Sequence, residues 1–272
     1  MPNVPTIALN GGGAIPQLGY GVFKVKPEEA ERAVGIAIQE GYRSIDTAAI
    51  YRNEEGVGRA IAAAEVPRAE LFVTTKLWNT DQGTDTALRA FETSLGKLGL
   101  DYVDLYLIHW PRPQDDKYVE SWRVLERIAA EGRARAIGVS NFTVAHLRRL
   151  IDETGTVPAV NQIELHPGLQ QNELHEFHRS HGIVTEAWSP LAQGELENPV
   201  IGALAEKHGR TPAQVVLRWH MQRGVVAIPK SVTPSRIREN IDVFGFALDE
   251  ADMRQMAGLD AGKRLGPDPE TF

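Results

Sequence analysis

Four ionisable side chains with complementary chemistry lie in the first half of the chain: Asp46, Tyr51, Lys76 and His109. A phenol can protonate a carbonyl oxygen that gains negative charge, if its pKa is lowered from about 10. A nearby ammonium at Lys76 would lower it, Asp46 would orient that ammonium, and His109 would hydrogen-bond the carbonyl. These residue types therefore suit the reduction of aldehydes and ketones by hydride.

Each of these residues also has a structural explanation when taken alone. A lone Asp after a strand is commonly a helix cap, a lone Tyr or His packs in a core, and a lone Lys reaches solvent. However, Asp46, Lys76 and His109 end three successive apolar runs, and Tyr51 lies in the loop after Asp46. Barrel enzymes carry their sites at the carboxyl ends of their strands. The pattern therefore favours one shared site over separate structural roles.

The elements that would position these residues follow a βα pattern from residue 19 onward. Longer segments of helical period separate short Val/Ile/Leu-rich runs, and they predict helices near Glu28–Gln39, Glu54–Ala64, Thr84–Lys97, Glu120–Ala130 and Val144–Ile151. About eight runs are present, and they end near Gly21, Asp46, Lys76, His109, Ser140, Gln162, Trp188 and Pro229. The pattern predicts an α/β fold, a (β/α)8 TIM barrel in a single domain over residues 1–272.

The start of the chain predicts a β-hairpin. Thr6–Leu9 and Ala14–Gln17 flank Asn10-Gly-Gly-Gly13, where glycine permits the positive φ of a tight turn. A phosphate-binding loop is the functional alternative, but no helix start follows these glycines. We expect the hairpin to cap one mouth of the barrel.

Composition limits the classes of partner. The net charge of −7 gives no overall positive field for nucleic acid or an anionic membrane surface. Cysteine is absent, which removes thiolate nucleophiles and cysteine-ligated metals and fits a reducing compartment. The first residues resemble no signal peptide, and no run is apolar enough to span a bilayer. We expect a cytoplasmic protein with no nucleic-acid or membrane partner.

Several long motifs resemble the aldo-keto reductase family. They occur in the family's order at Gly41–Gly58, Leu71–Trp78, Asp101–Pro111, Ile137–Asn141, Asn161–Pro167 and Ile228–Ser231. The resemblance runs from about Ile7 to Leu259 and is greatest to the bacterial 2,5-diketo-D-gluconic acid reductases. It implies that Asp46, Tyr51, Lys76 and His109 form the family's catalytic tetrad, the set that the residue types themselves indicate.

The resemblance also implies a nicotinamide site at later strand ends. It assigns Ser140, Asn141 and Gln162 to the carboxamide and the ring of Trp188 to stacking on the nicotinamide, where many relatives have Tyr. A serine hydrolase is an alternative for Ser189, but no nucleophile elbow surrounds it, and we expect Ser189 to contact the cofactor instead. Core packing is the ordinary alternative for Trp188 and Gln162. The resemblance adds Leu191 to the contacts.

A cluster of polar residues near the end of the chain predicts an anion site. Lys230, Ser231, Thr233 and Arg236 precede or begin a predicted helix, where phosphates are favoured. The resemblance implies that this stretch, with Val232, binds the adenosine 2′-phosphate, and that Glu239 and Asn240 lie near the adenine. The cofactor is therefore expected to be NADPH/NADP+ and no metal is expected.

Large aromatic residues predict the walls of a substrate pocket. Phe23, Trp78 and Trp110 follow strand ends, although each could equally pack in the core. The short, Pro-containing tail Gly262–Phe272 favours an open pocket for small carbonyls, which include 2,5-diketo-D-gluconate, methylglyoxal-like aldehydes and β-keto esters. Related barrels of this size are commonly monomers, so a monomer is expected.

Two other functions remain as alternatives. A metal-dependent hydrolase would use histidines such as His166, but none forms a His-x-His pair at a strand end, and His175, His178 and His181 have the spacing of a solvated helix face. A non-catalytic NADPH-binding subunit would keep the cofactor site alone. The intact tetrad argues against it, because a binding module has no use for a phenol beside an ammonium.

Overall fold

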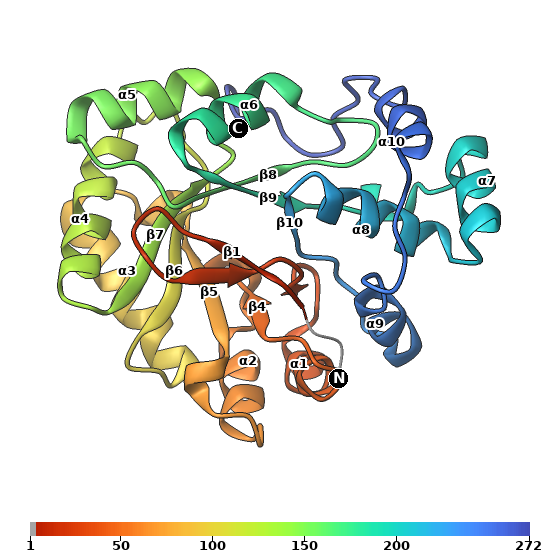
Figure 1. Cartoon of the computed structure of the whole chain (residues 1–272). Helices are drawn as coiled ribbons and strands as arrows, with labels where there is room; N and C mark the ends of the chain where they lie inside the picture. The colour runs from red at the N-terminus through yellow and green to blue at the C-terminus, as the bar shows by residue number, and fades with distance from the viewer. Residues whose placement is uncertain (1–3) are drawn as a thin grey trace.

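The computed structural model describes residues 4–272 as a parallel eight-stranded sheet that curls into a barrel (Figure 1). Consecutive strands are neighbours, as expected when each is followed by a crossover on the outside. The strands are β3 Tyr20–Gly21, β4 Ser44–Asp46, β5 Phe72–Leu77, β6 Val103–Ile108, β7 Ala134–Ser140, β8 Val160–Glu164, β9 Val184–Trp188 and β10 Val226–Ala227. Each strand ends within two residues of its predicted end.

The first and last strands of the sheet close the barrel. Leu18 forms a parallel bridge to Ala227, and the backbone N–H of Gly19 donates to the Ala227 oxygen at 2.9 Å. Inward-facing glycines permit this close approach, since a Cβ atom on Gly21 would lie 2.9 Å from the Ile228 oxygen. The prediction of a (β/α)8 barrel is confirmed.

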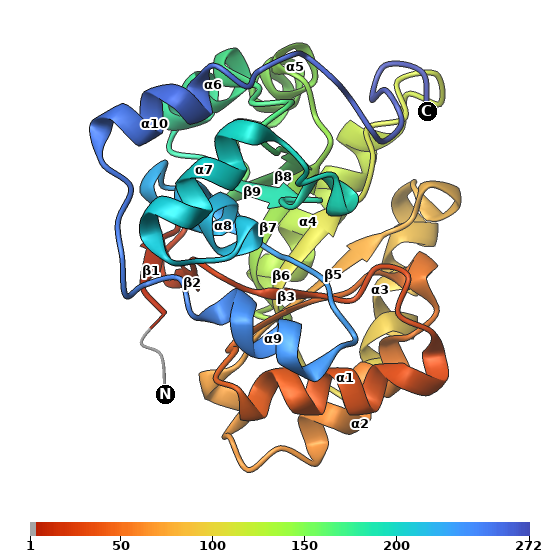
Figure 2. The same ribbon diagram turned by 90° about the vertical axis from the view of Figure 1, so that its right-hand side faces the viewer.

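Helices surround the strands on the outside (Figures 1 and 2). They are α1 Pro27–Gln39, α2 Glu54–Ala62, α3 Thr84–Leu98, α4 Tyr118–Ala130, α5 Val144–Thr154, α6 Asn172–His181, α7 Pro199–His208, α8 Pro212–Gln222, α9 Pro234–Ile241 and α10 Glu250–Ala257. Short 3₁₀ turns lie in the loops: η1 Ala49–Tyr51, η2 Arg68–Glu70, η3 Asn79–Asp81 and η4 Ala192–Gly194. Gly99 ends α3 with φ of 64°, a left-handed conformation that glycine adopts without strain.

The predicted N-terminal hairpin closes the end of the barrel where the strands begin. Strands β1 (Thr6–Ala8) and β2 (Ala14–Pro16) pair antiparallel, with Ile7 opposite Ile15. Leu9 and Ile15 are buried against side chains inside the barrel, among them Leu105 and Val184. This apolar layer excludes water from one end, so polar side chains inside the barrel lie nearer the other end.

One prediction about the outer helices is wrong. His178 does not belong to a solvated face: it is fully buried between α6 and the sheet. Its two ring nitrogens lie 2.8 Å from Thr185 Oγ1 and 2.9 Å from Asn161 Nδ2, outward-facing side chains of β9 and β8. Helical spacing alone did not indicate this, because the partners come from distant strands. His181 is exposed as predicted.

None of the helices within residues 4–272 combines the length and apolar character needed to cross a bilayer.

Candidate active site

The carboxyl ends of the strands surround a cavity of about 1340 Å³. Asp46 ends β4, Tyr51 ends η1 immediately beyond it, and His109 follows β6; all three line this cavity. Lys76, near the end of β5, is fully buried behind them. The structure therefore brings the four predicted catalytic side chains together.

A short ion pair anchors the group. Lys76 Nζ donates to Asp46 Oδ1 at 2.6 Å and to the backbone oxygen of Thr47 at 2.9 Å. Burial opposes the charge of the ammonium, but Asp46 and Tyr51 favour it, and together they leave the pKa of Lys76 above its usual value. Lys76 is thus a fixed cation beside the cavity.

Tyr51 lies over this cation, with the ring centroid 5.2 Å from Lys76 Nζ. Burial raises the pKa of the phenol to about 12, although the charge of Lys76 lowers it in part. The expectation of a pKa below 10 is therefore corrected: the cost of burying a phenolate exceeds the stabilisation by Lys76. Tyr51 holds its proton at neutral pH, which is the state a proton donor requires.

His109 presents a neutral imidazole to the same space. Its ring centroid lies 5.7 Å from that of Tyr51 and 5.2 Å from that of Trp78. Burial, reinforced by the positive charge of Lys76, holds the pKa of His109 well below its usual value. A neutral imidazole can donate a hydrogen bond without adding a charge to the cavity.

Gln162 connects this group to a residue that sequence reasoning missed. Gln162 Nε2 donates to Asp46 Oδ2 and to Glu186 Oε2, both at 2.8 Å. Glu186 is fully buried in β9, and burial together with Asp46 raises its pKa to about 8. A charged residue inside the run Val184–Trp188 was the available signal, because strands of such barrels are otherwise apolar there.

Asn141 supports the indole predicted to stack on the cofactor. Its Nδ2 donates to the His109 oxygen at 2.9 Å and to Ser140 Oγ at 3.0 Å, while its Oδ1 accepts from Trp188 Nε1 at 2.7 Å. Ser140 is fully buried, and its hydroxyl donates to the backbone oxygen of Gln162 at 2.8 Å. Asn141 and Trp188 reach the cavity, whereas Ser140 lies behind them.

The predicted anion site lies at another part of the cavity, around the start of α9. Lys230 and Arg236 are exposed cations that line the cavity, and neither is paired with a carboxylate in the described chain. Glu239 accepts from Thr211 Oγ1 at 2.7 Å, which holds α9 against the start of α8. Two positive charges without partners leave this part of the cavity suited to a phosphate.

Most of the remaining predicted residues also line the cavity. Those that line it are Phe23, Trp78, Trp110, Gln162, Ser189, Leu191, Ser231, Glu239 and Asn240. Val232 and Thr233 are not among the lining residues, nor is Ser140. Ser140 is fully buried, whereas Thr233 is exposed just before α9.

The C-terminal tail forms a wall that sequence reasoning did not predict. After α10 the chain runs back across the molecule (Figures 1 and 2), and Leu265–Pro267 and Phe272 line the cavity. The ring centroid of Phe272 lies 4.6 Å from that of Trp110 and 6.4 Å from that of Trp78. The tail is short, but it narrows the pocket that was expected to be open.

Buried and exposed polar contacts hold this tail. The Glu164 carboxylate accepts from the backbone N–H groups of Leu265 at 2.6 Å and Gly266 at 3.0 Å. His166 Nε2 lies 3.0 Å from the same carboxylate. Beyond it, Lys263 pairs at 2.6 Å with Glu195, which follows η4. An exposed ion pair therefore joins the tail to the residue that follows η4.

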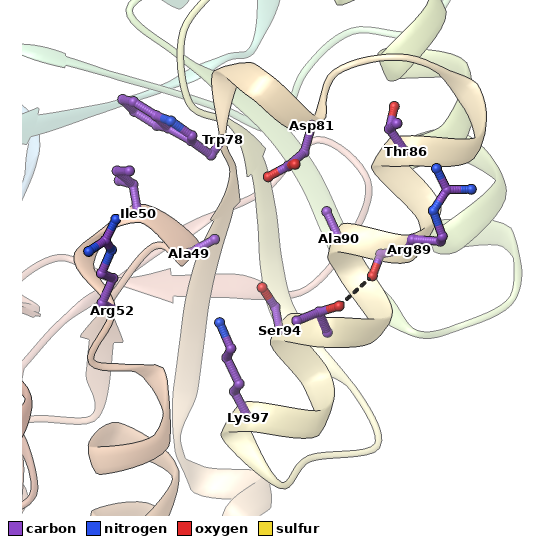
Figure 3. A pocket seen from close by; sticks show the side chains of 11 residues that line it. Ala49, Ile50, Arg52, Trp78, Asp81, Thr86, Arg89, Ala90, Ser94 and Lys97 are labelled. Carbon is purple, nitrogen blue, oxygen red and sulfur yellow. Dashed lines mark hydrogen bonds between the residues drawn. The ribbon is translucent and has the colours of Figure 1, made fainter.

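A second cavity of about 540 Å³ lies between η1 and α3 and shares Ile50 and Trp78 with the first. In Figure 3 Lys97 points toward its centre, and Arg89 stands beside Thr86 at the other side. Both cations are exposed and unpaired in the described chain. Ile50 and Trp78 thus lie between the second cavity and the cavity that holds the tetrad.

Comparison with known proteins agrees with this arrangement. The model described as Aldo/keto reductase family matches residues 11–261. A Yersinia pestis protein named methylglyoxal reductase DkgA is 57% identical over 271 residues, which cover 98% of this chain and 97% of that protein. Among solved structures, an aldo/keto reductase from Brucella melitensis is 56% identical, covers 96% of this chain and 99% of its own, and superposes with a TM-score of 0.94. A mutant of Gox0644 in complex with NADPH is 50% identical, covers 99% of both chains and has a TM-score of 0.96. The chain therefore belongs to the aldo/keto reductase family.

Proposed function

We propose that this protein reduces aldehydes and ketones to alcohols with NADPH, and that Tyr51 is the proton donor. The observation that carries the proposal is the phenol ring of Tyr51 lying beside the Lys76–Asp46 ion pair in a large cavity. The NADPH-bound structural relative and the membership of the family support the choice of cofactor.

The proposed roles follow from the charges. When bound, the nicotinamide supplies the hydride. The carbonyl oxygen then gains negative charge, and Tyr51 transfers its proton to that oxygen while His109 donates a second hydrogen bond. Lys76 stabilises the phenolate that remains on Tyr51, and Asp46 keeps the ammonium in place.

The cavity has features that fit a phosphorylated dinucleotide. Its volume of about 1340 Å³ exceeds the roughly 300–1,000 Å³ of a pocket for one drug-sized ligand. The Trp188 indole and the free oxygen of Gln162 suit the nicotinamide end, where Asn141 supports the indole. Lys230 and Arg236 suit a 2′-phosphate, because they are unpaired in the described chain.

We propose small, polar carbonyl compounds as substrates. Trp78, Trp110 and Phe272 narrow the space next to His109, which favours a compact substrate. Methylglyoxal-like aldehydes are supported by the name of the Yersinia pestis relative, and 2,5-diketo-D-gluconate and β-keto esters are further candidates.

A panel assay tests the proposal. The near-ultraviolet absorbance of NADPH, and then of NADH, is followed with methylglyoxal, 2,5-diketo-D-gluconate, ethyl acetoacetate and nitrobenzaldehyde. Turnover with NADPH is expected, and the order of kcat/KM across the panel identifies the preferred class. NADPH binding without turnover of any carbonyl would instead favour a non-catalytic NADPH-binding subunit.

We further propose that residues 1–272 act as one domain and as a cytoplasmic monomer. All the strands of the large sheet belong to one barrel, and residues of a single chain line the cavity. The absence of cysteine fits a reducing compartment. Light scattering of the purified protein measures its mass directly.

A further inference from the structure

Glu186 is a buried carboxyl group that the proposed reaction does not use. Alternate residues of a strand face the same side, so Val184, Glu186 and Trp188 point into the barrel at three successive levels. Val184 belongs to the apolar layer above the hairpin, and Trp188 reaches the cavity. Glu186 lies between them and is 0% exposed.

The amide of Gln162 connects Glu186 to the catalytic ion pair. Gln162 and Glu186 are partners in the parallel register of β8 and β9. The amide nitrogen donates to Glu186 on one side and to Asp46 on the other, at 2.8 Å each. Both of its N–H groups are then used, so only its oxygen remains for the cavity that Gln162 lines.

The charges around Glu186 determine its protonation. Asp46 on β4, Lys76 on β5 and Tyr51 in η1 are the titratable groups that interact with it, and Val226 on β10, its other neighbour, is apolar. Asp46 already balances Lys76, so a second buried carboxylate has no cation of its own. Burial and the charge of Asp46 raise the pKa of Glu186 to about 8. Glu186 is therefore neutral at neutral pH.

We infer that Glu186 is a positioning residue of this active site. It holds the side-chain amide oxygen of Gln162 toward the cofactor cavity, and in its neutral form it places no second negative charge near Tyr51. The inference rests on the proposed reduction and adds a residue that acts without touching cofactor or substrate.

A pH dependence follows from the charge. Ionised Glu186 raises the pKa of Tyr51, and a phenol with a higher pKa is a weaker proton donor. Carbonyl reduction should therefore slow as pH rises through about 8, the pKa of Glu186.

The first experiment compares pH profiles of kcat for reduction by the wild type, Glu186→Gln and Glu54→Gln. Glu54 is the matched control, because it is also a buried glutamate but accepts from Thr75 on the outer side of β5 at 2.6 Å. Between pH about 6.5 and about 9.5, kcat of the wild type should fall about three- to tenfold, as expected for up to about one unit of change in the donor pKa. Glu54→Gln should keep this fall, and Glu186→Gln should lose it.

The second experiment measures the Kd for NADPH by protein fluorescence. Glu186→Leu removes the acceptor that holds one side of the Gln162 amide, so the Kd should rise about tenfold. In Glu186→Gln the new amide oxygen still accepts from Gln162, so the Kd should rise less than in the Leu variant.

Three results would overturn the inference: a wild-type kcat that stays constant over this pH range, a Glu186→Gln protein that retains the fall at the same pH, or a Leu variant that binds NADPH as tightly as the wild type. If the Leu variant does not fold, the profile of the Gln variant decides. A wild type that reduces no carbonyl contradicts the proposed function instead, and the Kd of the Leu variant still tests Glu186.

Discussion

Gly266 lies directly against the indole of Trp188: a Cβ atom at Gly266 would be 2.4 Å from Cη2 of the ring and 3.1 Å from Glu164 Oε2. The wall predicted to stack on the nicotinamide is thus packed against the C-terminal tail. Because the Glu164 carboxylate also holds the backbone of Leu265 and Gly266, the position of the tail and that of the indole depend on each other.

Gly266→Ala should weaken cofactor binding, because the added methyl group displaces either the tail or Trp188. We expect the KM for NADPH to rise about tenfold, equivalent to about 1.4 kcal/mol. Gly96→Ala in α3 is the control, since its Cβ would meet nothing within 4 Å. Equal KM values for the two variants would show that the contact with Trp188 does not matter for the cofactor.

Tyr51→Phe should bind NADPH as the wild type does but lose carbonyl reduction by about 10²–10⁴-fold, the usual contribution of a positioned proton donor. The ring remains over Lys76, so only the hydroxyl is lost. Single-turnover kinetics separate binding from chemistry. Turnover within a few-fold of the wild type would remove Tyr51 from the proposed role.

Replacing both Lys230 and Arg236 by Gln should reduce the preference for NADPH over NADH. Each lost charge-assisted contact to a phosphate costs about 1.5–3 kcal/mol, or about 10- to 100-fold. The control is the double replacement of Arg89 and Lys97 by Gln, which removes the same charges from the second cavity. If the Lys230/Arg236 variant keeps the wild-type preference for NADPH over NADH, the 2′-phosphate binds elsewhere.

Stability should fall as the solution becomes acidic, because several histidines, among them His178 and His220, are buried without charge. Burial lowers the pKa of His178 and of His220 to about 3, from 6.5. Between these values the unfolded chain binds more protons than the folded protein, so protonation favours unfolding as pH falls.

Urea unfolding at several pH values measures this effect. For each such histidine, the free energy of unfolding should fall by about 1.4 kcal/mol per pH unit below about 6.5. His178→Asn should reduce the slope of the free energy of unfolding against pH. His181→Asn, at an exposed position of the same helix, should leave that slope unchanged. Equal slopes for both variants would contradict the buried, neutral state of His178.

Much of the fold followed from local sequence pattern. The predicted strand ends at Gly21, Asp46, Ser140 and Trp188 coincide with the ends of β3, β4, β7 and β9. Helix ends differed more: the predicted helix to Ala64 ends at Ala62, and the one to Ile151 continues to Thr154. Strand ends were readable because the apolar runs stop at the rim of the barrel, while helix ends depend on caps and packing.

The chain by itself determined which side chains share a site. Asp46, Lys76 and His109 come at the ends of successive parallel strands, and parallel strands bring their carboxyl ends to one rim, so order along the chain implied proximity. The tertiary structure alone decided the energetic state of that site. Whether Tyr51 has a raised or lowered pKa, whether Glu186 is protonated and where Phe272 lies depend on burial and on contacts between distant segments. Desolvation and contacts of this kind arise only when the barrel closes and the tail folds back, so no local pattern encodes them.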